Sequence, residues 1–196
     1  DGWEADLRAY FDAIERLGLD LLRYFAAYLN LPEDTLSRHF LSGLSTLRLI
    51  HYPPMAGASG EDPDRGARMG TPEHTDSGCL TLLAQDGTGG LQVRDLDGVW
   101  FDVTPVRGAI VMNLGDLLQR WTNHTFVATA HRVVAATSSR FSAPFFLEPR
   151  AETEISCLPS CVSDEDPARD GPIRYVDYLV SKLRRFQEYA DLVAEG

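Results

Sequence analysis

The feature that most constrains the fold is a series of short β-prone runs between Cys79 and Leu147, separated by turn-forming residues. The predicted strands cover residues 79–84, 91–94, 99–103, 109–113, 117–121, 126–128, 131–136 and 141–147. Asp97-Gly98, between the second and third of these strands, is a strong hairpin signal. Many short strands at close, regular spacing predict a β-sandwich or a small barrel.

Helices are predicted on both sides of these strands. Apolar residues recur at helical spacing over 3–29, and Pro32 is typical of the first position of a short second helix. An amphipathic helix near the C-terminus is predicted from a set of apolar residues that share one face: Val176, Leu179, Val180, Leu183, Phe186 and Ala190. One more strand is expected over 45–52.

The 196 residues are expected to form one domain, α+β but mainly β. Its predicted parts are helical support at 1–43, a barrel at 44–148 and a C-terminal extension with a helix at 149–196. Within it, the Gly-rich and charged residues 55–70 predict a mobile loop. This loop either closes over a site when ligand binds or is a surface loop without a gating role.

The composition disfavours several classes of partner. A net charge of −11, with no Lys/Arg cluster beyond Arg184-Arg185, argues against binding to nucleic acid or to an anionic membrane surface. No apolar run approaches the length of a membrane span. Three cysteines are too few for a disulfide framework and fit a reducing compartment, so a cytoplasmic location is expected. Cys157 and Cys161 lack a second pair that would complete a zinc site and are interpreted as free thiols.

Two segments carry candidate metal ligands. In an extended backbone His74 and Asp76 point to the same side, so an imidazole nitrogen and a carboxylate oxygen converge there. His131 opens an apolar strand and faces the side of Val133 and Ala135. Taken alone, a His-x-Asp match is a weak signal, and His131 by itself is better interpreted as a core histidine bonded to a backbone carbonyl.

A third segment points to a bound carboxylate. Arg140 and Ser142 stand two residues apart on one predicted strand, so a guanidinium and a hydroxyl share one face. Arginine grips a carboxylate with two parallel charge-assisted bonds, which would explain such a pair inside an apolar barrel. The alternative is an arginine at the barrel rim that pairs with an Asp or Glu of the chain.

The order and spacing of these motifs resemble a known family, the iron(II)/2-oxoglutarate-dependent dioxygenases of the isopenicillin N synthase-like group. The motifs that carry the resemblance are His74-Thr75-Asp76, His131 and Arg140-Phe141-Ser142. Further segments agree with it: the strand that ends in Tyr52-Pro53, the turn Asn113-Leu114-Gly115-Asp116, Trp121-Thr122-Asn123 and Ala130-His131-Arg132-Val133. Each motif is weak alone, but their ordered set covers nearly the whole chain.

The resemblance implies a double-stranded β-helix, or jelly-roll barrel, with His74, Asp76 and His131 holding Fe(II). The 2-oxoglutarate cosubstrate would chelate the iron, and its distal carboxylate would meet Arg140, with hydrogen bonds from Ser142 and Tyr52. Reaction with O2 would oxidise a small organic substrate, most simply by hydroxylation, and release succinate and carbon dioxide. Family members carry a substantial region before the helix that begins here near Trp3, so the chain is expected to be a fragment, a processed form or a short relative.

Two other functions remain open at this point. One is an oxidase of the same fold that uses iron and oxygen without the oxo acid, in which Arg140, Ser142 and Tyr52 bind a carboxylate of the substrate itself. The other is a metal-binding barrel without turnover. Among the remaining polar residues, His51 is predicted on an outer strand face, His39 and His124 in polar helix-end and loop positions, and Asn113 in a turn rather than beside the metal.

Overall fold

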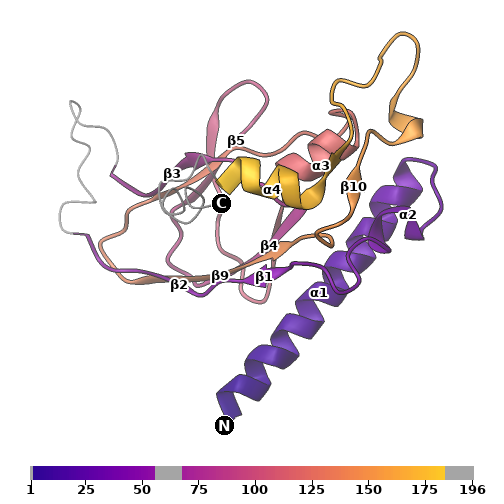
Figure 1. Cartoon of the computed structure of the whole chain (residues 1–196). Helices are drawn as coiled ribbons and strands as arrows, with labels where there is room; N and C mark the ends of the chain where they lie inside the picture. The colour runs from indigo at the N-terminus through magenta and orange to yellow at the C-terminus, as the bar shows by residue number, and fades with distance from the viewer. Residues whose placement is uncertain (1, 56–67, 184–196) are drawn as a thin grey trace.

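The computed structural model describes residues 2–55 and 68–183, and its strands β1–β9 form two antiparallel sheets (Figure 1). The first sheet has the strand order β1-β9-β4-β7 with β2 also paired to β9, and the second has the order β3-β8-β5-β6. The strands are β1 (Thr46–Leu47), β2 (Ile50–Tyr52), β3 (Met69–His74), β4 (Leu80–Gln85), β5 (Leu91–Arg94), β6 (Trp100–Asp102), β7 (Val111–Leu114), β8 (His131–Val134) and β9 (Arg140–Leu147). A short pair, β10 (Glu154–Ile155) with β11 (Ile173–Arg174), follows them.

The two sheets face each other across a small inner cluster. Leu83 of β4, in the first sheet, packs with Leu91 and Val133 of β5 and β8, in the second, and Tyr52 and Val111 contact this group. Opposite strand faces therefore differ: the inner face of each sheet lines the barrel, and the outer face of the first sheet packs against a helix. The predicted mainly β architecture with flanking helices is confirmed.

Helix α1 (Gly2–Tyr28) covers the outer face of the first sheet, and its N-terminal end extends beyond the sheets (Figure 1). Its Phe11 ring meets Phe145 of β9 edge to face, with the ring centroids 5.0 Å apart. Further along α1, Gly18 faces the side chain of Leu147 on the same strand. A Cβ atom added there would lie 3.0 Å from Leu147, so glycine lets the helix approach the sheet closely.

One predicted strand is wrong, because residues 116–121 form the helix α3 (Asp116–Trp121). Its buried residues, Leu117, Leu118 and Trp121, have helical spacing, and Asp116 in the first turn with Arg120 in the last suits the helix dipole. The run 126–128 is also not a strand. Its backbone N–H groups go to side chains, Phe126 N to Thr122 Oγ1 at 3.3 Å and Ala128 N to Gln119 Oε1 at 2.7 Å.

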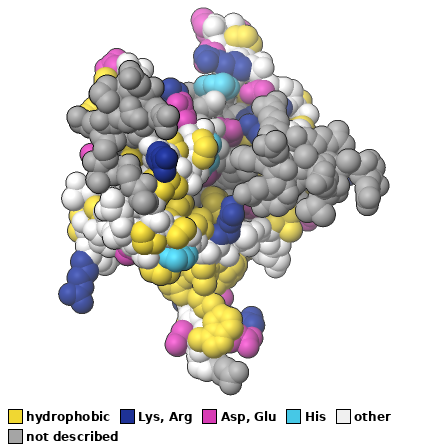
Figure 2. All heavy atoms as spheres, turned by 90° about the vertical axis from the view of Figure 1, so that its left-hand side faces the viewer, with side chains coloured by type: hydrophobic (Ala, Val, Ile, Leu, Met, Phe, Trp, Pro, Cys, Tyr) yellow, Lys and Arg dark blue, Asp and Glu magenta, His cyan; other side chains and the backbone are white. Residues whose placement is uncertain are grey.

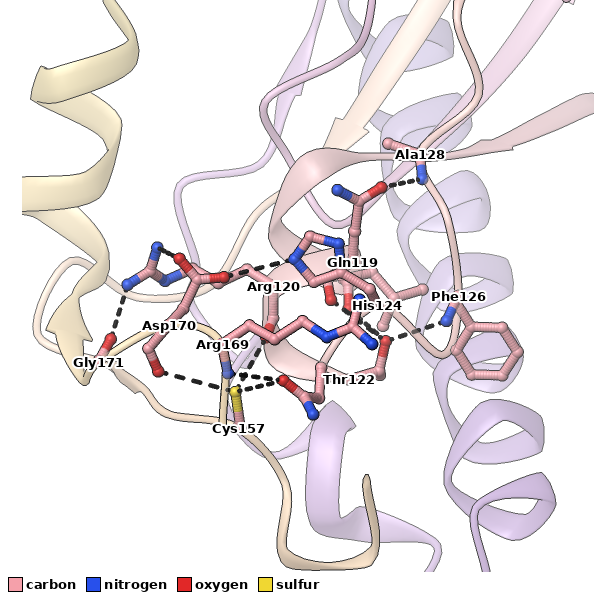
Figure 3. A network of polar contacts seen from close by, with 12 residues as sticks. Gln119, Arg120, Thr122, His124, Phe126, Ala128, Cys157, Arg169, Asp170 and Gly171 are labelled. Carbon is pink, nitrogen blue, oxygen red and sulfur yellow. Dashed lines mark hydrogen bonds and ion pairs between the residues drawn. The ribbon is translucent and has the colours of Figure 1, made fainter. Parts of the chain in front are cut away.

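Polar contacts fix the segment that follows α3 and leads to His131 (Figure 3). Arg120 donates to Asp170 Oδ1 at 2.7 Å and to the carbonyl of Gly171 at 2.6 Å, which ties α3 to the chain before β11. The Cys157 thiol lies in the same network, 3.8 Å from the carbonyl oxygen of Asp170. Cys157 and Cys161 are not joined by a disulfide bond.

Two further predicted elements differ from the structure at their ends. Residues 69–70, predicted as part of the loop 55–70, belong to β3; the strand was not predicted because Gly70 and Pro72 are unusual in strands. Residues 56–67 of that predicted loop lie outside the described part of the chain. Helix α4 (Tyr175–Leu183) buries Tyr175 and Tyr178 fully and the predicted apolar face only partly. The last two residues of that predicted face, Phe186 and Ala190, are outside the described part. Within 2–55 and 68–183 every helix is too short or too polar to cross a bilayer.

Candidate metal centre

Strand pairing brings the two predicted histidine ligands together. His74 ends β3 and His131 begins β8, and the two residues are direct partners in the β3–β8 ladder. The register of this pair shifts twice between Met69 and His74. Such bulges re-aim side chains and are frequent beside functional sites. Asp76 lies two residues beyond the end of β3 and is buried.

The three side chains form a compact donor set. The Nε2 atoms of His74 and His131 each lie 3.7 Å from Asp76 Oδ1. One ligand atom from each residue falls within 4.8 Å of the others, and within the described residues this is the one His, Cys, Asp and Glu group with such geometry. Two imidazoles and one carboxylate on a single side fit a six-coordinate divalent metal with open positions, for which iron(II) is the typical occupant.

Backbone carbonyls hold both imidazoles in the orientation that a metal needs. His74 Nδ1 lies 2.8 Å from the carbonyl oxygen of Pro72, and His131 Nδ1 lies 3.0 Å from that of Thr129. The proton therefore sits on Nδ1, which donates to the carbonyl, and the Nε2 lone pair is directed at the shared centre. The carbonyl contact expected of a core histidine is present at His131, but it serves to aim the ring at Asp76.

The Asp76 carboxylate is held by two side chains that the sequence patterns did not place at the site. Asp76 Oδ2 accepts hydrogen bonds from Thr81 Oγ1 at 2.5 Å and from Asn113 Nδ2 at 2.6 Å. These bonds occupy Oδ2 and leave Oδ1 toward the two imidazoles. The interpretation of Asn113 as a turn residue is wrong, because it lies in β7, paired with Thr81 across the β4–β7 ladder.

We expect Thr81→Val and Asn113→Ala each to weaken binding of a divalent metal about 10–100-fold, because second partners of metal ligands have effects of this size. Anaerobic titration with Fe(II) or Co(II) measures the change. Thr88→Val is the matched control, since Thr88 Oγ1 donates to the carbonyl of Ser139, away from the site. Unchanged metal affinity in both test variants would contradict the positioning of Asp76 by these bonds.

The residues that follow Asn113 explain the rest of the Asn-x-Gly-Asp motif. Gly115 N donates to the Cys79 carbonyl at 3.0 Å and Asp116 N donates to the Asp76 carbonyl at 2.8 Å. A Cβ atom on Gly115 would lie only 2.1 Å from the backbone oxygen of Gly78. Glycine is thus required for the chain before α3 to dock against the segment that carries Asp76.

Replacing Gly115 by alanine should destabilise the fold by roughly 2–3 kcal/mol, because the added methyl collides with rigid backbone. Gly87→Ala is a suitable control, since nothing lies within 4 Å of the position that its methyl would take and its backbone is not left-handed. Thermal unfolding of the two metal-free variants beside the wild type gives the comparison. A Gly115→Ala midpoint equal to that of Gly87→Ala would show that the two backbone segments can separate at little cost.

Arg140 is fully buried and only partly satisfied. Its side chain is 1% exposed, Nε donates to the Gly89 carbonyl at 2.8 Å and one terminal nitrogen, Nη2, donates to Gln85 Oε1 at 3.1 Å. The other terminal nitrogen, Nη1, is buried and has no hydrogen-bond partner among residues 2–55 and 68–183. Among the described residues no carboxylate oxygen comes within 4 Å of this guanidinium, so the interpretation as a paired rim arginine does not hold.

The turn that presents Gly89 to Arg140 is itself anchored by a carboxylate. Asp86 accepts from Phe141 N at 2.5 Å and from Thr88 N at 2.9 Å. Burial alone would raise the pKa of Asp86, but these bonds and the positive charge of Arg140 lower it. Gly89 has φ +84°, a conformation that glycine adopts without strain. The turn therefore holds its shape around the arginine.

The other predicted site residues lie as follows. Ser142 is buried on β9 and pairs with Ile50 and with Gln85, while Tyr52 pairs with Arg140. The Tyr52 hydroxyl is 3.1 Å from Thr71 Oγ1, and its ring centroid is 5.0 Å from the Arg140 guanidinium carbon. Tyr52 thus packs beside Arg140, with its hydroxyl already bonded to a neighbour.

The remaining histidines stand apart from the metal centre. His51 is exposed, as predicted, and stacks on Phe141 with 4.5 Å between ring centroids. His124 Nε2 lies 3.5 Å from Asp170 Oδ2. His39 packs near Trp121, and burial together with the charges of two arginines lowers its pKa.

A hollow of about 460 Å³ crosses β2, β9 and β4 near their Arg140 end. It is lined by Leu49, Ile50, His51, Ala84, Gln85, Asp86, Phe141, Ser142 and Ala143. None of the three candidate metal ligands lines it, so its lining does not define the centre of the chemistry. Figure 2 shows the side of the molecule toward which β2 and the start of β9 point, where hydrophobic side chains gather among scattered Lys and Arg side chains.

Comparison with known sequences agrees with this geometry. The model of the 2OG-Fe(II) oxygenase superfamily matches residues 43–149. A 2-oxoglutarate-Fe(II) type oxidoreductase of Emericella nidulans is 37% identical over 172 residues, which are 87% of this chain and 48% of that protein. Gibberellin 2-beta-dioxygenase 4 of Arabidopsis thaliana is 37% identical over 80% of this chain and 51% of its own length. The chain spans about half the length of these relatives.

Solved structures give the same result. A full-length Neurospora crassa protein in complex with α-ketoglutarate and thymine superimposes with a TM-score of 0.86, at 32% identity, over 94% of this chain and 57% of that protein. A 2OG-Fe(II) oxygenase family protein from Caulobacter crescentus superimposes with a TM-score of 0.81, at 34% identity, over 93% of this chain and 59% of its own. The two-sheet barrel described above is therefore the jelly roll of these proteins.

Proposed function

The chain belongs to the 2OG-Fe(II) oxygenase superfamily, and from this premise we propose that it carries the catalytic barrel of an iron(II) and 2-oxoglutarate-dependent dioxygenase. In this proposal His74, Asp76 and His131 hold Fe(II), and Arg140 with Ser142 binds the distal carboxylate of 2-oxoglutarate. The iron supplies O2 activation coupled to oxidative decarboxylation of the oxo acid, which releases succinate and carbon dioxide.

The observation that carries the proposal is the buried, unpartnered Nη1 atom of Arg140. A buried cation without a paired carboxylate is costly, and an ionised carboxylate of a ligand would both neutralise it and accept the free N–H. Gly89 and Gln85 satisfy the other side of the guanidinium, so its position is fixed before a ligand arrives. The role of the barrel is then to hold this anchor and the metal ligands in one rigid, dry frame.

Tyr52 was predicted to hydrogen-bond the oxo acid, but its contacts favour a role in holding Arg140 in place. With its hydroxyl bonded to Thr71 and its ring beside the guanidinium, we propose that it supports Arg140 and does so whether or not it also contacts the oxo acid. Positioning of Asp76 by Thr81 and Asn113 does the corresponding work for the metal.

The substrate is proposed to be a small organic molecule that is oxidised, most simply by hydroxylation. Support comes from the Neurospora crassa protein, whose structures hold thymine in one case and 5-formyluracil in another.

We also propose that the whole chain acts as one catalytic domain, with the barrel at 44–148 supported by the family match over 43–149. The three free cysteines support the proposed cytoplasmic location.

The test is turnover of 2-oxoglutarate. Fe(II)-loaded protein should form succinate in air when incubated with a panel of small heterocyclic, acidic and alcoholic candidate substrates, and the substrate that raises the rate identifies the class. Oxygen consumption without succinate would favour the iron oxidase, in which Arg140 binds a carboxylate of the substrate. Metal binding with neither activity would favour the barrel without turnover.

A further inference from the structure

Gln85 occupies a position that no part of the proposed function has used. It ends β4 and pairs with Ser142 across the β4–β9 ladder, so the two residues lie side by side on adjacent strands. Its side chain reaches the guanidinium of Arg140, where Oε1 accepts from Nη2 at 3.1 Å. A neutral amide thus stands where a carboxylate would ordinarily pair with a buried arginine.

The orientation of this amide follows from chemistry. A guanidinium has five N–H donors and no acceptor, so the amide must present its oxygen to Arg140 and turn its nitrogen away. The Gln85 Nε2 atom, turned away from Arg140, is buried and has no hydrogen-bond partner in the part of the chain that the structure describes. Arg140 Nη1 is in the same condition. Buried donors are almost always satisfied, so two of them on touching side chains call for one explanation.

One ligand can satisfy both donors. The Gln85 amide and the Arg140 guanidinium already touch through the bond from Nη2 to Oε1. The two free donors, Gln85 Nε2 and Arg140 Nη1, are the other nitrogens of these same two groups. A carboxylate offers two oxygens and about four acceptor sites, enough for both N–H groups and the hydroxyl of Ser142 as well. A single positive charge with two neutral partners matches a single negative charge.

We infer that Gln85 is a carboxylate-binding residue of the cosubstrate site, donating from Nε2 to the distal carboxylate of a dicarboxylic oxo acid while its Oε1 fixes Arg140. The inference rests on the proposed function, because it assigns Gln85 to the same ligand. It explains why the residue is an amide. A carboxylate at this position would neutralise Arg140 and repel the ligand, and an apolar side chain would leave Nη2 unpaired.

The experiment compares two ligands and two variants. Metal-loaded protein is titrated calorimetrically without oxygen, first with 2-oxoglutarate and then with 2-oxopentanoate, which has the same oxo acid end and chain length but no distal carboxylate. The variants are Gln85→Met, which keeps the volume without a donor, and Gln85→Glu. Gln92→Met is the control, because Gln92 bonds Asp102 and Arg132 in the other sheet.

We expect Gln85→Met to raise the Kd for 2-oxoglutarate about tenfold, and Gln85→Glu to raise it about a hundredfold or more. The Kd for 2-oxopentanoate should stay within about twofold of wild type in Gln85→Met, because that ligand never meets the amide. Gln92→Met should leave both constants unchanged.

Equal binding of 2-oxoglutarate by wild type and Gln85→Met would overturn this inference alone. So would an equal loss of affinity for both ligands, since Gln85 would then act on the fold and not on the distal carboxylate. A wild type that binds metal but shows no affinity for 2-oxoglutarate would overturn the proposed function, and the inference with it.

Discussion

The His131→Ala variant should lose most of its bound metal. Removing one of three ligands leaves Asp76 and His74, and the loss should exceed the roughly 10–100-fold that follows when only a ligand's hydrogen-bonding partner is removed. The fold should persist, because His131 is an edge-of-core residue whose Nδ1 makes a single bond to the Thr129 carbonyl. Metal analysis after purification in Fe(II), and anaerobic titration with Co(II), measure the loss.

A second readout separates metal loss from misfolding. A ligand that binds only the folded state raises its stability by an amount set by concentration and affinity, so added metal should raise the Tm of wild type and not of the variant. His51→Ala is the matched control, since His51 is an exposed histidine that stacks on Phe141 away from the centre. Undiminished metal content in His131→Ala would remove this residue from the ligand set.

Most of the strands could be predicted from the sequence because their apolar runs are short and end at clear turns. The hairpin at Asp97-Gly98 is an example: Gly98 has φ +83° and the strands on either side pair as β5 and β6. Residues 117–121 were wrongly predicted as a strand, because five residues with three apolar side chains fit both the strand and the helix periodicity. The charges that identify a helix, Asp116 at its start and Arg120 near its end, were the signal that decides the case.

The candidate site also has a part that the sequence predicted and a part that only the structure reveals. The grouping of His74 with Asp76 and the inward side chain of Arg140 follow from spacing along an extended chain, which determines which residues share a face, while their roles stay predictions. Their partners come from other strands, so only the sheet register reveals them. A weaker signal was present: Thr81 and Gln85 are polar residues four apart in the otherwise apolar run Leu80–Gln85, and both turned out to bond a site residue.

Burial of charge is a further property that local sequence does not show. Glu148 follows β9, and burial raises its pKa to about 7, with the charge of Asp76 adding to the shift. The nearby thiol of Cys79 is fully buried, which raises its pKa far above the usual range and makes it inert. Neither residue carries a motif: Glu148 lies beside Tyr175 of α4, and Cys79 is in the core cluster that also holds Leu117 and Leu118 of α3.

The Arg140→Met variant should bind 2-oxoglutarate about 10–100-fold more weakly than wild type, or worse, while its metal affinity stays nearly unchanged. The reason for the loss is the charge-assisted bond that Nη1 makes to the distal carboxylate in the proposed complex. Arg140→Lys should recover only part of the affinity, because an ammonium cannot reach Gly89, Gln85 and the ligand at once. Calorimetric titration of anaerobic, metal-loaded protein measures both variants.

The Tm of ligand-free Arg140→Met gives a second, independent test of this prediction. Arg140 is 1% exposed and lacks an ion-pair partner among the described residues, so the ligand-free barrel carries a poorly compensated charge. Exchange for methionine removes that charge and keeps most of the volume, but it leaves the Gly89 carbonyl and Gln85 Oε1 without their donor, so the Tm without ligand is expected to fall only by the cost of these two lost hydrogen bonds. At one concentration of 2-oxoglutarate, the Tm of wild type should rise more than that of Arg140→Met. If Arg140→Met binds 2-oxoglutarate as tightly as wild type, the carboxylate anchor lies elsewhere and Arg140 is a structural residue of the barrel.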